Sequence, residues 1–167
     1  GAVGLTLDAT KSVHIRGRGR LLTALTYSGT GAAVKIDGTG TDPNDWGSLQ
    51  SLKIQCTGAG AAKGLHLVHV HRGFLHDVYL LGNSYAASSI GVYCDNGFGN
   101  YMYQTIVAGF DRGIDLDGTC HDFTIHDVNI GADEICVRVK DSKDVRIKGG
   151  QHSGTGSTIG HAIIATA

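Results

Sequence analysis

Hydrophobic and polar positions along the chain repeat one short pattern: a glycine or other small residue, an apolar residue, a variable residue and a second apolar residue. The clearest copies are GLTL at Gly4, GLHL at Gly64, GVYC at Gly91 and GIDL at Gly113. Looser copies are AVKI at Ala33, CVRV at Cys136 and AIIA at Ala162. Alternation with a period of two marks a strand with one buried face, so each copy predicts a short β-strand.

The copies recur along the whole chain. Their first apolar positions lie 22 to 31 residues apart, at Leu5, Val34, Leu65, Val92, Ile114, Val137 and Ile163. A second short strand follows most copies, at SVHI (Ser12), SLKI (Ser51), DVYL (Asp77), DVNI (Asp127) and DVRI (Asp144). Repeats of this length that carry only short strands are typical of a solenoid, in which neighbouring repeats bury one another.

No repeat contains a stretch of about 10–15 residues with helical period, which excludes layers of alternating strands and helices. The consensus of leucine-rich repeats, with its asparagine and its helical return, is also absent. We therefore predict an all-β fold, a right-handed parallel β-helix (solenoid) of about seven rungs of 22–31 residues. The first apolar positions of the copies would stack as one internal ladder. A single domain would cover residues 1–167, and we expect it to be a fragment of a longer chain.

Composition agrees with a fold that turns often. Glycine supplies 26 of the 167 residues, and hydrophobic residues make up 41% of the chain. The net charge of −1 argues against a general nucleic-acid binder, and no apolar run approaches the length that membrane insertion requires. The four cysteines form no CxxC pair. We interpret them as small buried thiols rather than as disulfides or zinc ligands.

Two runs of sequence resemble a known family. The segments SVHIRGRGRLLTALTYSGTGAAVKI (12–36) and IVAGFDRGIDLDGTCHDFTIHDVNI (106–130) resemble the pectin-lyase-like right-handed β-helix superfamily. Within it, they are most similar to bacteriophage tailspike and tail-fibre β-helices and to secreted polysaccharide-degrading relatives. The resemblance implies a polysaccharide partner, an extracellular role as a virion tail component or secreted protein, and a homotrimer. Arg112 stands where the polygalacturonase branch has its first catalytic aspartate, which argues against that activity.

If the copies stack in register, their variable positions form outward ladders about 4.8 Å apart per rung. The first ladder would be Lys35, His66, Tyr93, Asp115 and Arg138, and the second would be Val68, Asp95, Asp117 and Lys140. Acids, bases and a tyrosine together suit a groove for a sugar polymer. The same residues also suit a purely structural surface, because opposite charges on neighbouring strands stabilise a sheet modestly.

Two carboxylate pairs are candidate catalytic groups. Asp115 and Asp117 would point the same way from one strand, about 6.6 Å apart at the backbone. Carboxyl groups ~6.5–9.5 Å apart can hold a water against a glycosidic bond, so this pair predicts glycoside hydrolysis. The second pair is Asp133 and Glu134, adjacent acids at the next corner. A calcium-dependent polysaccharide lyase would instead use clustered aspartates with Arg138 or Lys140 as the base.

Aromatic residues and histidines complete the candidate chemistry. We predict that substrate contacts come from Lys35, His66, Tyr93, Asp95, Tyr101, Tyr103, Arg138 and Lys140, and Trp46 occupies a further loop. HVH at His69 would place two imidazoles on one strand face, with no third metal ligand fixed by spacing. The repeated HDV motifs at His76 and His126 favour a stacking or turn role. No metal site or cofactor is predicted, and the alternative function is a non-catalytic rod of a tail fibre or adhesin.

Overall fold

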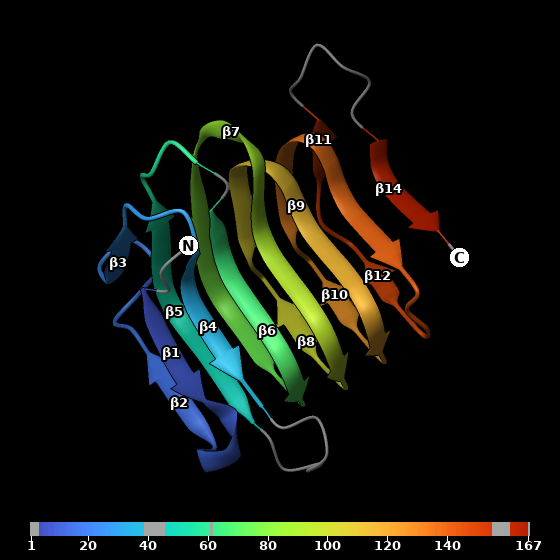
Figure 1. The fold of residues 1–167 in the computed structure, drawn as a ribbon, viewed down its shortest axis with the longest axis horizontal. Coiled ribbons are helices and arrows are strands. Elements are labelled where there is room, and N and C mark those ends of the chain that lie inside the picture. Colours follow the sequence, from blue (N-terminus) through green and yellow to red (C-terminus); the bar gives the residue numbers. More distant parts are fainter. Residues whose placement is uncertain (1–3, 39–45, 61, 155–160, 167) are drawn as a thin grey trace.

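The chain forms a parallel β-solenoid in the computed structural model, which describes residues 4–38, 46–60 and 62–154, and the backbone of 161–166 (Figure 1). Its strands are β1 (Leu5–Asp8), β2 (Val13–Arg16), β3 (Ala24–Tyr27), β4 (Ala32–Asp37), β5 (Gly47–Cys56), β6 (Lys63–His71), β7 (Phe74–Phe98), β8 (Tyr101–Tyr103), β9 (Ile106–His121), β10 (Thr124–His126), β11 (Asn129–Lys140), β12 (Arg146–Lys148), β13 (His152–Gly154) and β14 (His161–Thr166). One 3₁₀ helix, Ala9–Lys11, follows β1.

The strands pair in parallel and build three faces. Face A contains β1, β4, β6, the last parts of β7, β9 and β11, and β14. Face B contains β2, the first parts of β5 and β7, and β8, β10 and β12. Face C contains β3, the second part of β5, the middle of β7, the first parts of β9 and β11, and β13. A strand such as β7 therefore bends through all three faces without a loop.

The predicted fold class is confirmed: the chain is all-β, and its arrangement is consistent with a right-handed β-helix. The solenoid makes about five turns, fewer than the seven rungs that the sequence predicts. Each copy of the sequence repeat corresponds to one strand of face A. The last of these strands, β14, has no partner strand on its far side within the described residues. The number of face A strands therefore exceeds the number of complete turns.

The predicted internal ladder has the predicted register. Leu5 pairs with Val34, Val34 with Leu65, and the series continues through Val92, Ile114 and Val137 to Ile163. The side chains from Val34 to Val137 in this series are fully buried. Burying these ladders is the main favourable contribution to folding, because each turn covers the apolar face of the next.

Glycine opens the repeat because the chain passes close to its neighbour on entering face A. A Cβ on Gly91 would lie 2.6 Å from the carbonyl oxygen of Gly113, and a Cβ on Gly113 would lie 2.6 Å from that of Cys136. Such distances leave no room for a side chain. The glycine of the sequence pattern thus marks one corner of the solenoid on successive turns.

The corner between faces B and C uses left-handed backbone on successive turns from Ser51 onward. Ser51, Asp77, Gln104 and Asp127 occupy equivalent positions, with φ values of 51°, 53°, 47° and 52°. Aspartate tolerates this conformation better than most residues that carry a side chain. The repeated HDV motifs therefore have the turn role that the sequence predicts, since each motif places its aspartate at this corner and its histidine on face B.

The corner between faces A and B contains a buried amide. Asn100 is 1% exposed, its Oδ1 accepts a hydrogen bond of 2.7 Å from the Gly73 backbone N–H, and its Nδ2 donates one of 3.1 Å to the Val70 carbonyl. The side chain thereby satisfies backbone groups that the bend would leave unpaired. Asn100 holds consecutive turns together where face A ends.

Candidate functional site

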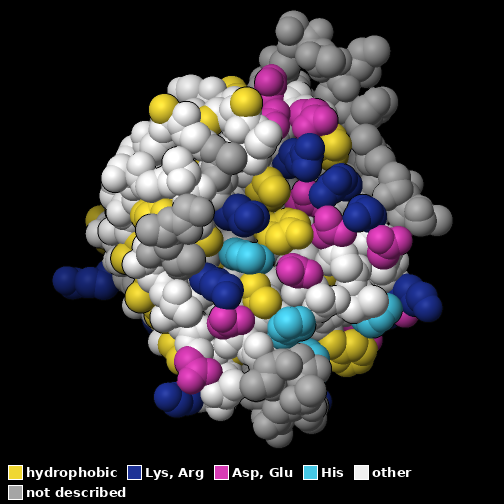
Figure 2. Space-filling view, in the orientation of Figure 1, with side chains coloured by type: hydrophobic (Ala, Val, Ile, Leu, Met, Phe, Trp, Pro, Cys, Tyr) yellow, Lys and Arg dark blue, Asp and Glu magenta, His cyan; other side chains and the backbone are white. Residues whose placement is uncertain are grey.

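Face A has a charged cluster, visible in Figure 2 as Lys and Arg side chains among Asp and Glu side chains. At its centre lies Asp115, whose side chain is 0% exposed although it points outward, because its neighbours cover it. Arg138 donates to both of its oxygens, from Nε to Oδ1 at 2.6 Å and from Nη2 to Oδ2 at 2.8 Å. Arg112 adds a contact of 3.5 Å from Nη1 to Oδ2. The carboxylate is thus paired on both oxygens.

Asp117 belongs to the same cluster. Its Oδ1 accepts hydrogen bonds from Lys140 Nζ at 3.1 Å and from the Gly118 N–H at 2.8 Å, and its Oδ2 lies 3.4 Å from Arg138 Nη2. Burial acts to raise the pKa of Asp117, but the hydrogen bonds from Lys140 and Gly118 outweigh it, so the pKa is lowered. Asp117 is therefore held as a charged acceptor, the opposite of what a general acid needs.

The second predicted carboxylate pair lies at the edge of this cluster. Glu134 is exposed, and its Oε2 accepts a hydrogen bond of 3.0 Å from Arg112 Nε. Asp133 is half-buried. Arg112 thus links Glu134 to Asp115, and Asp115, Asp117 and Glu134 belong to one network of ion pairs. A catalytic role for any of these four acids stays a prediction, and their contacts are those of a charged sheet surface.

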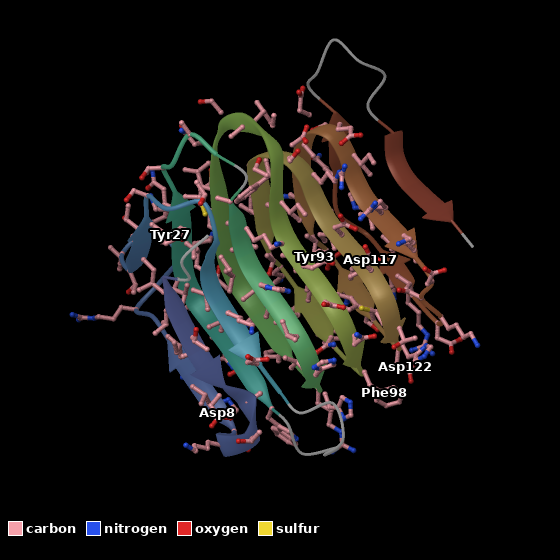
Figure 3. The ribbon with its side chains drawn as sticks, viewed as in Figure 1. Asp8, Tyr27, Tyr93, Phe98, Asp117 and Asp122 are labelled. Carbon is pink, nitrogen blue, oxygen red and sulfur yellow. The ribbon has the colours of Figure 1, made fainter. Side chains whose placement is uncertain are left out.

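The other residues predicted on face A lie in the predicted register. Lys35 pairs with His66, His66 with Tyr93, and Tyr93 with Asp115. The His66 and Tyr93 rings are 5.0 Å apart, and Lys63 Nζ lies 5.0 Å from the Tyr93 centroid (Tyr93 and Asp117 are labelled in Figure 3).

Burial shifts two pKa values on this face. It lowers the pKa of His66 to about 4, with Lys63 and Lys35 adding to the shift, and raises the pKa of Tyr93 to about 12. Both side chains are therefore neutral at pH 7. Asp95 accepts a hydrogen bond of 3.1 Å from Asn96 Nδ2 and pairs in register with Asp117. The charged groups at the centre of face A thus have partners within the chain, whereas the buried Nε2 of His66 has no hydrogen-bond partner among the described residues.

Tyr101 and Tyr103, which the sequence groups with Tyr93 as substrate contacts, lie on face B instead. Face B carries two outward ladders, and the first is His14, Ser48, Phe74, Tyr101, Thr124 and Arg146. The second is Arg16, Gln50, His76, Tyr103, His126 and Lys148. Sequence reasoning missed this face: of the second short strands that it marked, SVHI and DVRI lie on face B, whereas SLKI, DVYL and DVNI lie on face C.

Five rings cover the middle of face B, namely Phe74, His76, Tyr101, Tyr103 and His126, and we call them the ring ladder. Phe74 stacks on Tyr101 at 5.8 Å and 16°, and His76 stacks on Tyr103 at 5.4 Å and 10°. His126 lies 5.2 Å from Tyr103, and its Nδ1 is 3.1 Å from the Tyr101 hydroxyl. All five side chains are half-buried, so each ring keeps part of its surface in contact with solvent.

A hollow of about 240 Å³ opens at one end of the ring ladder. Trp46 and Phe74 line it with aromatic rings, and the small residues Gly47 and Ser48 leave the space between them. Its remaining lining residues are polar: His14, Gln50 and Arg72. Trp46 is 40% exposed, and the Ser48 Oγ lies 2.7 Å from His14 Nδ1. Small-molecule sites are concave, with aromatic walls and a few polar groups, and this hollow lies just below their usual volume of ~300–1,000 Å³.

A second hollow, of about 420 Å³, lies where face A meets face B. His71, Phe98 and His121 line it from successive turns, together with His69, Asn96, Gly97 and Thr119. Among the described residues, no group of three or more His, Cys, Asp or Glu side chains is arranged to hold a metal ion. The described residues also contain no helix with the length and apolar character needed to cross a membrane.

Comparison of the chain with protein-family models, with curated proteins and with solved structures finds no match.

Proposed function

We propose that this β-solenoid binds a polysaccharide along face B. The observation that carries the proposal is the ring ladder, five partly exposed rings in two adjacent rows that continue at one end into a hollow with aromatic walls. The parts of these rings that stay exposed offer apolar contact area to a sugar, and the polar groups beside them hydrogen-bond to sugar hydroxyls.

The repeat of the solenoid supports a polymeric ligand. Neighbouring turns are ~4.8 Å apart, which is close to the length of one pyranose unit in an extended chain. A polysaccharide aligned with the solenoid axis would therefore meet equivalent side chains on each turn. Gln50 and Lys148 lie in the same row as the stacked His76 and Tyr103, and supply hydrogen-bonding groups along this path.

Cleavage is the less supported part of the proposal. Hydrolysis by Asp115 and Asp117 would require Arg138 to release a carboxylate that it contacts through both oxygens. The network of ion pairs favours a structural role for face A, and the binding proposal does not depend on it.

The proposal also includes a family, a location and an oligomeric state. We propose that the chain is a member of the pectin-lyase-like superfamily, acts outside the cell as part of a tailspike or as a secreted protein, and forms a homotrimer. The parallel β-solenoid and the segments 12–36 and 106–130 support this part of the proposal. Leu21 and Leu22, which are 82% and 81% exposed near the N-terminal end, are candidate contacts between protomers. Light scattering on the purified chain distinguishes a trimer from a monomer.

The test compares two tyrosine variants on a panel of bacterial capsules, O-antigens and pectins. Binding is measured by affinity electrophoresis or calorimetry, together with new reducing ends and absorbance of unsaturated products. Tyr103→Ala removes the centre of the ring ladder, and we expect about tenfold weaker binding, or about 1.4 kcal/mol. Tyr93→Ala removes a tyrosine from face A and should leave binding unchanged.

The outcomes separate the candidate functions. Equal loss in both tyrosine variants would remove face B as the site. No binding by the folded wild-type chain to any polysaccharide would favour the non-catalytic rod. Reducing ends without unsaturated products would indicate a hydrolase, and unsaturated products a lyase.

A further inference from the structure

Two cysteine side chains from neighbouring turns meet in the core beneath face A. The Sγ atoms of Cys94 and Cys120 are 3.1 Å apart, and both residues are 0% exposed. The Cys120 Sγ also lies 3.4 Å from the carbonyl oxygens of Cys94 and Asp117. The other two cysteines, Cys56 and Cys136, are buried and free, and their sulfurs lie 3.9 Å from backbone carbonyls. The four buried thiols expected from the sequence are thus confirmed, but two of them touch.

A local irregularity of the sheet creates this contact. Cys94 is an inward residue of the repeat and pairs with Leu116, but a register shift follows, so that Gly97 pairs with Cys120. The extra residue on the Cys120 strand brings that side chain back over Cys94. A Cβ on Gly97 would lie 3.0 Å from the Cys94 Sγ, so the absence of a side chain there leaves room for the pair.

We propose that Cys94 and Cys120 form a reversible disulfide that links neighbouring turns when the protein meets a peroxide. This inference is independent of polysaccharide binding. Bond formation requires the sulfurs to approach by about 1 Å, since an S–S bond is about 2.05 Å long. The bond would close a ring that spans one turn of the solenoid.

The two thiols have different reactivity. The contact with the Cys94 sulfur lowers the pKa of Cys120, and Ser142 adds to the lowering. The same contact and burial raise the pKa of Cys94. Cys120 is therefore the attacking thiolate and Cys94 the resolving thiol.

The reaction with hydrogen peroxide balances in two steps. The Cys120 thiolate attacks one peroxide oxygen, the O–O bond breaks, and hydroxide leaves and takes up a proton to become water, which gives a sulfenic acid. The Cys94 sulfur then attacks the Cys120 sulfur, the S–O bond breaks, and the second oxygen leaves as water with the proton of Cys94. The two thiols lose two electrons in total, which reduce one peroxide to two waters.

The hollow between faces A and B is lined by neighbours of the cysteine pair. Thr119 and His121, the sequence neighbours of Cys120, line the hollow of about 420 Å³, as does Gly97. The hollow lies beside Phe98, which Figure 3 labels at the edge of the molecule near Asp122. Neither sulfur is exposed, so an oxidant reaches the pair only when the chain opens locally, and a small peroxide needs less opening than a bulky disulfide reagent.

The experiment counts thiols after peroxide treatment of the reduced, folded chain. Excess peroxide is removed with catalase, the protein is alkylated in denaturant, and intact mass gives the number of labelled cysteines. We expect two labels instead of four and a peptide that joins Cys94 to Cys120 in a non-reducing digest. Dithiothreitol should restore four labels.

Two variants test the assignment within the same assay. Cys136→Ala is the matched control and should still lose two labels, from three to one. Cys94→Ala should form no disulfide within the chain and should leave Cys120 as a sulfenic acid that dimedone traps. Four labels in the treated wild type, a different cysteine pair in the digest, or a loss that dithiothreitol does not reverse would each overturn the proposal.

Discussion

Faces A and B are built alike but use their outward positions differently. Both are parallel sheets with outward ladders, and both carry residues that sequence reasoning assigned to substrate binding. On face A the ladder ends in ion pairs between side chains of the same chain, and Asp115 is sealed from solvent by Arg138. On face B the ladder carries stacked rings that stay half-exposed, beside a hollow.

The difference shows that the same kind of ladder can be used up by contacts within the chain or left partly exposed. Acids and bases at facing positions on neighbouring turns neutralise one another, so a charged ladder tends to stabilise the rod. Rings in the same arrangement stack on one another but keep part of their surface for a further partner. The predictions below test this contrast between a structural face and a binding face.

The largest expected effect comes from breaking the central ion pair of face A. Arg138→Ala leaves the buried Asp115 carboxylate without its two short hydrogen bonds, and we expect a loss of about 3–5 kcal/mol in the free energy of unfolding. Urea denaturation measures it. Adding Asp115→Asn to this variant should recover part of the loss, because it removes the unpaired charge. If Arg138→Ala is as stable as wild type, face A does not have the structural role described.

The next effect should appear on face B as a loss of binding. Phe74 belongs both to the ring ladder and to the wall of the hollow beside Trp46, so Phe74→Ala should weaken polysaccharide binding by about tenfold or more, about 1.4 kcal/mol. Thr124→Ala, a change on the same outward ladder, is the control. Equal effects of the two changes would mean that stacking does not carry the binding.

A smaller effect concerns pH and belongs to face A. The pKa of His66 is about 4 in the folded chain and about 6.5 when unfolded, so between these values the unfolded chain binds the additional proton. Stability should therefore fall as pH drops from about 6.5 towards 4, by at most about 3 kcal/mol for the full shift and on the order of 1 kcal/mol once the partial exposure of this side chain is allowed for. His66→Gln should flatten the dependence. Burial also lowers the pKa of His152, so part of the pH dependence of stability should remain in the His66→Gln variant.

The smallest effect should come from the exposed end of the charged cluster. The Lys140 side chain is 45% exposed and contacts Asp117 at 3.1 Å, so Lys140→Ala should cost less than about 1 kcal/mol. Thermal unfolding of this variant beside Arg138→Ala compares an exposed with a buried ion pair on one sheet. A cost equal to that of Arg138→Ala would contradict the difference that burial is expected to make.

The sequence predicted the fold and the register because both depend on the inward positions. The alternation at Leu65, Val92 and Ile114 leaves one way to bury the apolar side chains, and this choice fixes the outward neighbours on the same strands. The pairing of Asp115 with Arg138 followed directly from that register.

The candidate site was less predictable because it depends on corners. Tyr93, Tyr101 and Tyr103 are close in sequence, but the bend at Gly99 and Asn100 separates the first from the other two. The contact of Tyr103 with His76 and His126 required a register for the face B segments around Phe74, Tyr101 and Thr124, which the repeat of the sequence did not mark as strands. The burial of Asp115 depends on how closely the Arg138 side chain covers it. This is a property of side-chain packing, which the spacing of residues in the sequence does not determine.

The passage of β7 through three faces without a loop has a mechanical consequence. Hydrogen bonds between turns run along the axis, so a pull on the two ends of the solenoid loads the bonds of all three faces of a turn together. A strand that continues round each corner transmits that load from face to face. The rod should therefore yield one turn at a time from its ends, while a ligand bound across several turns of face B would share the tension and delay the first rupture.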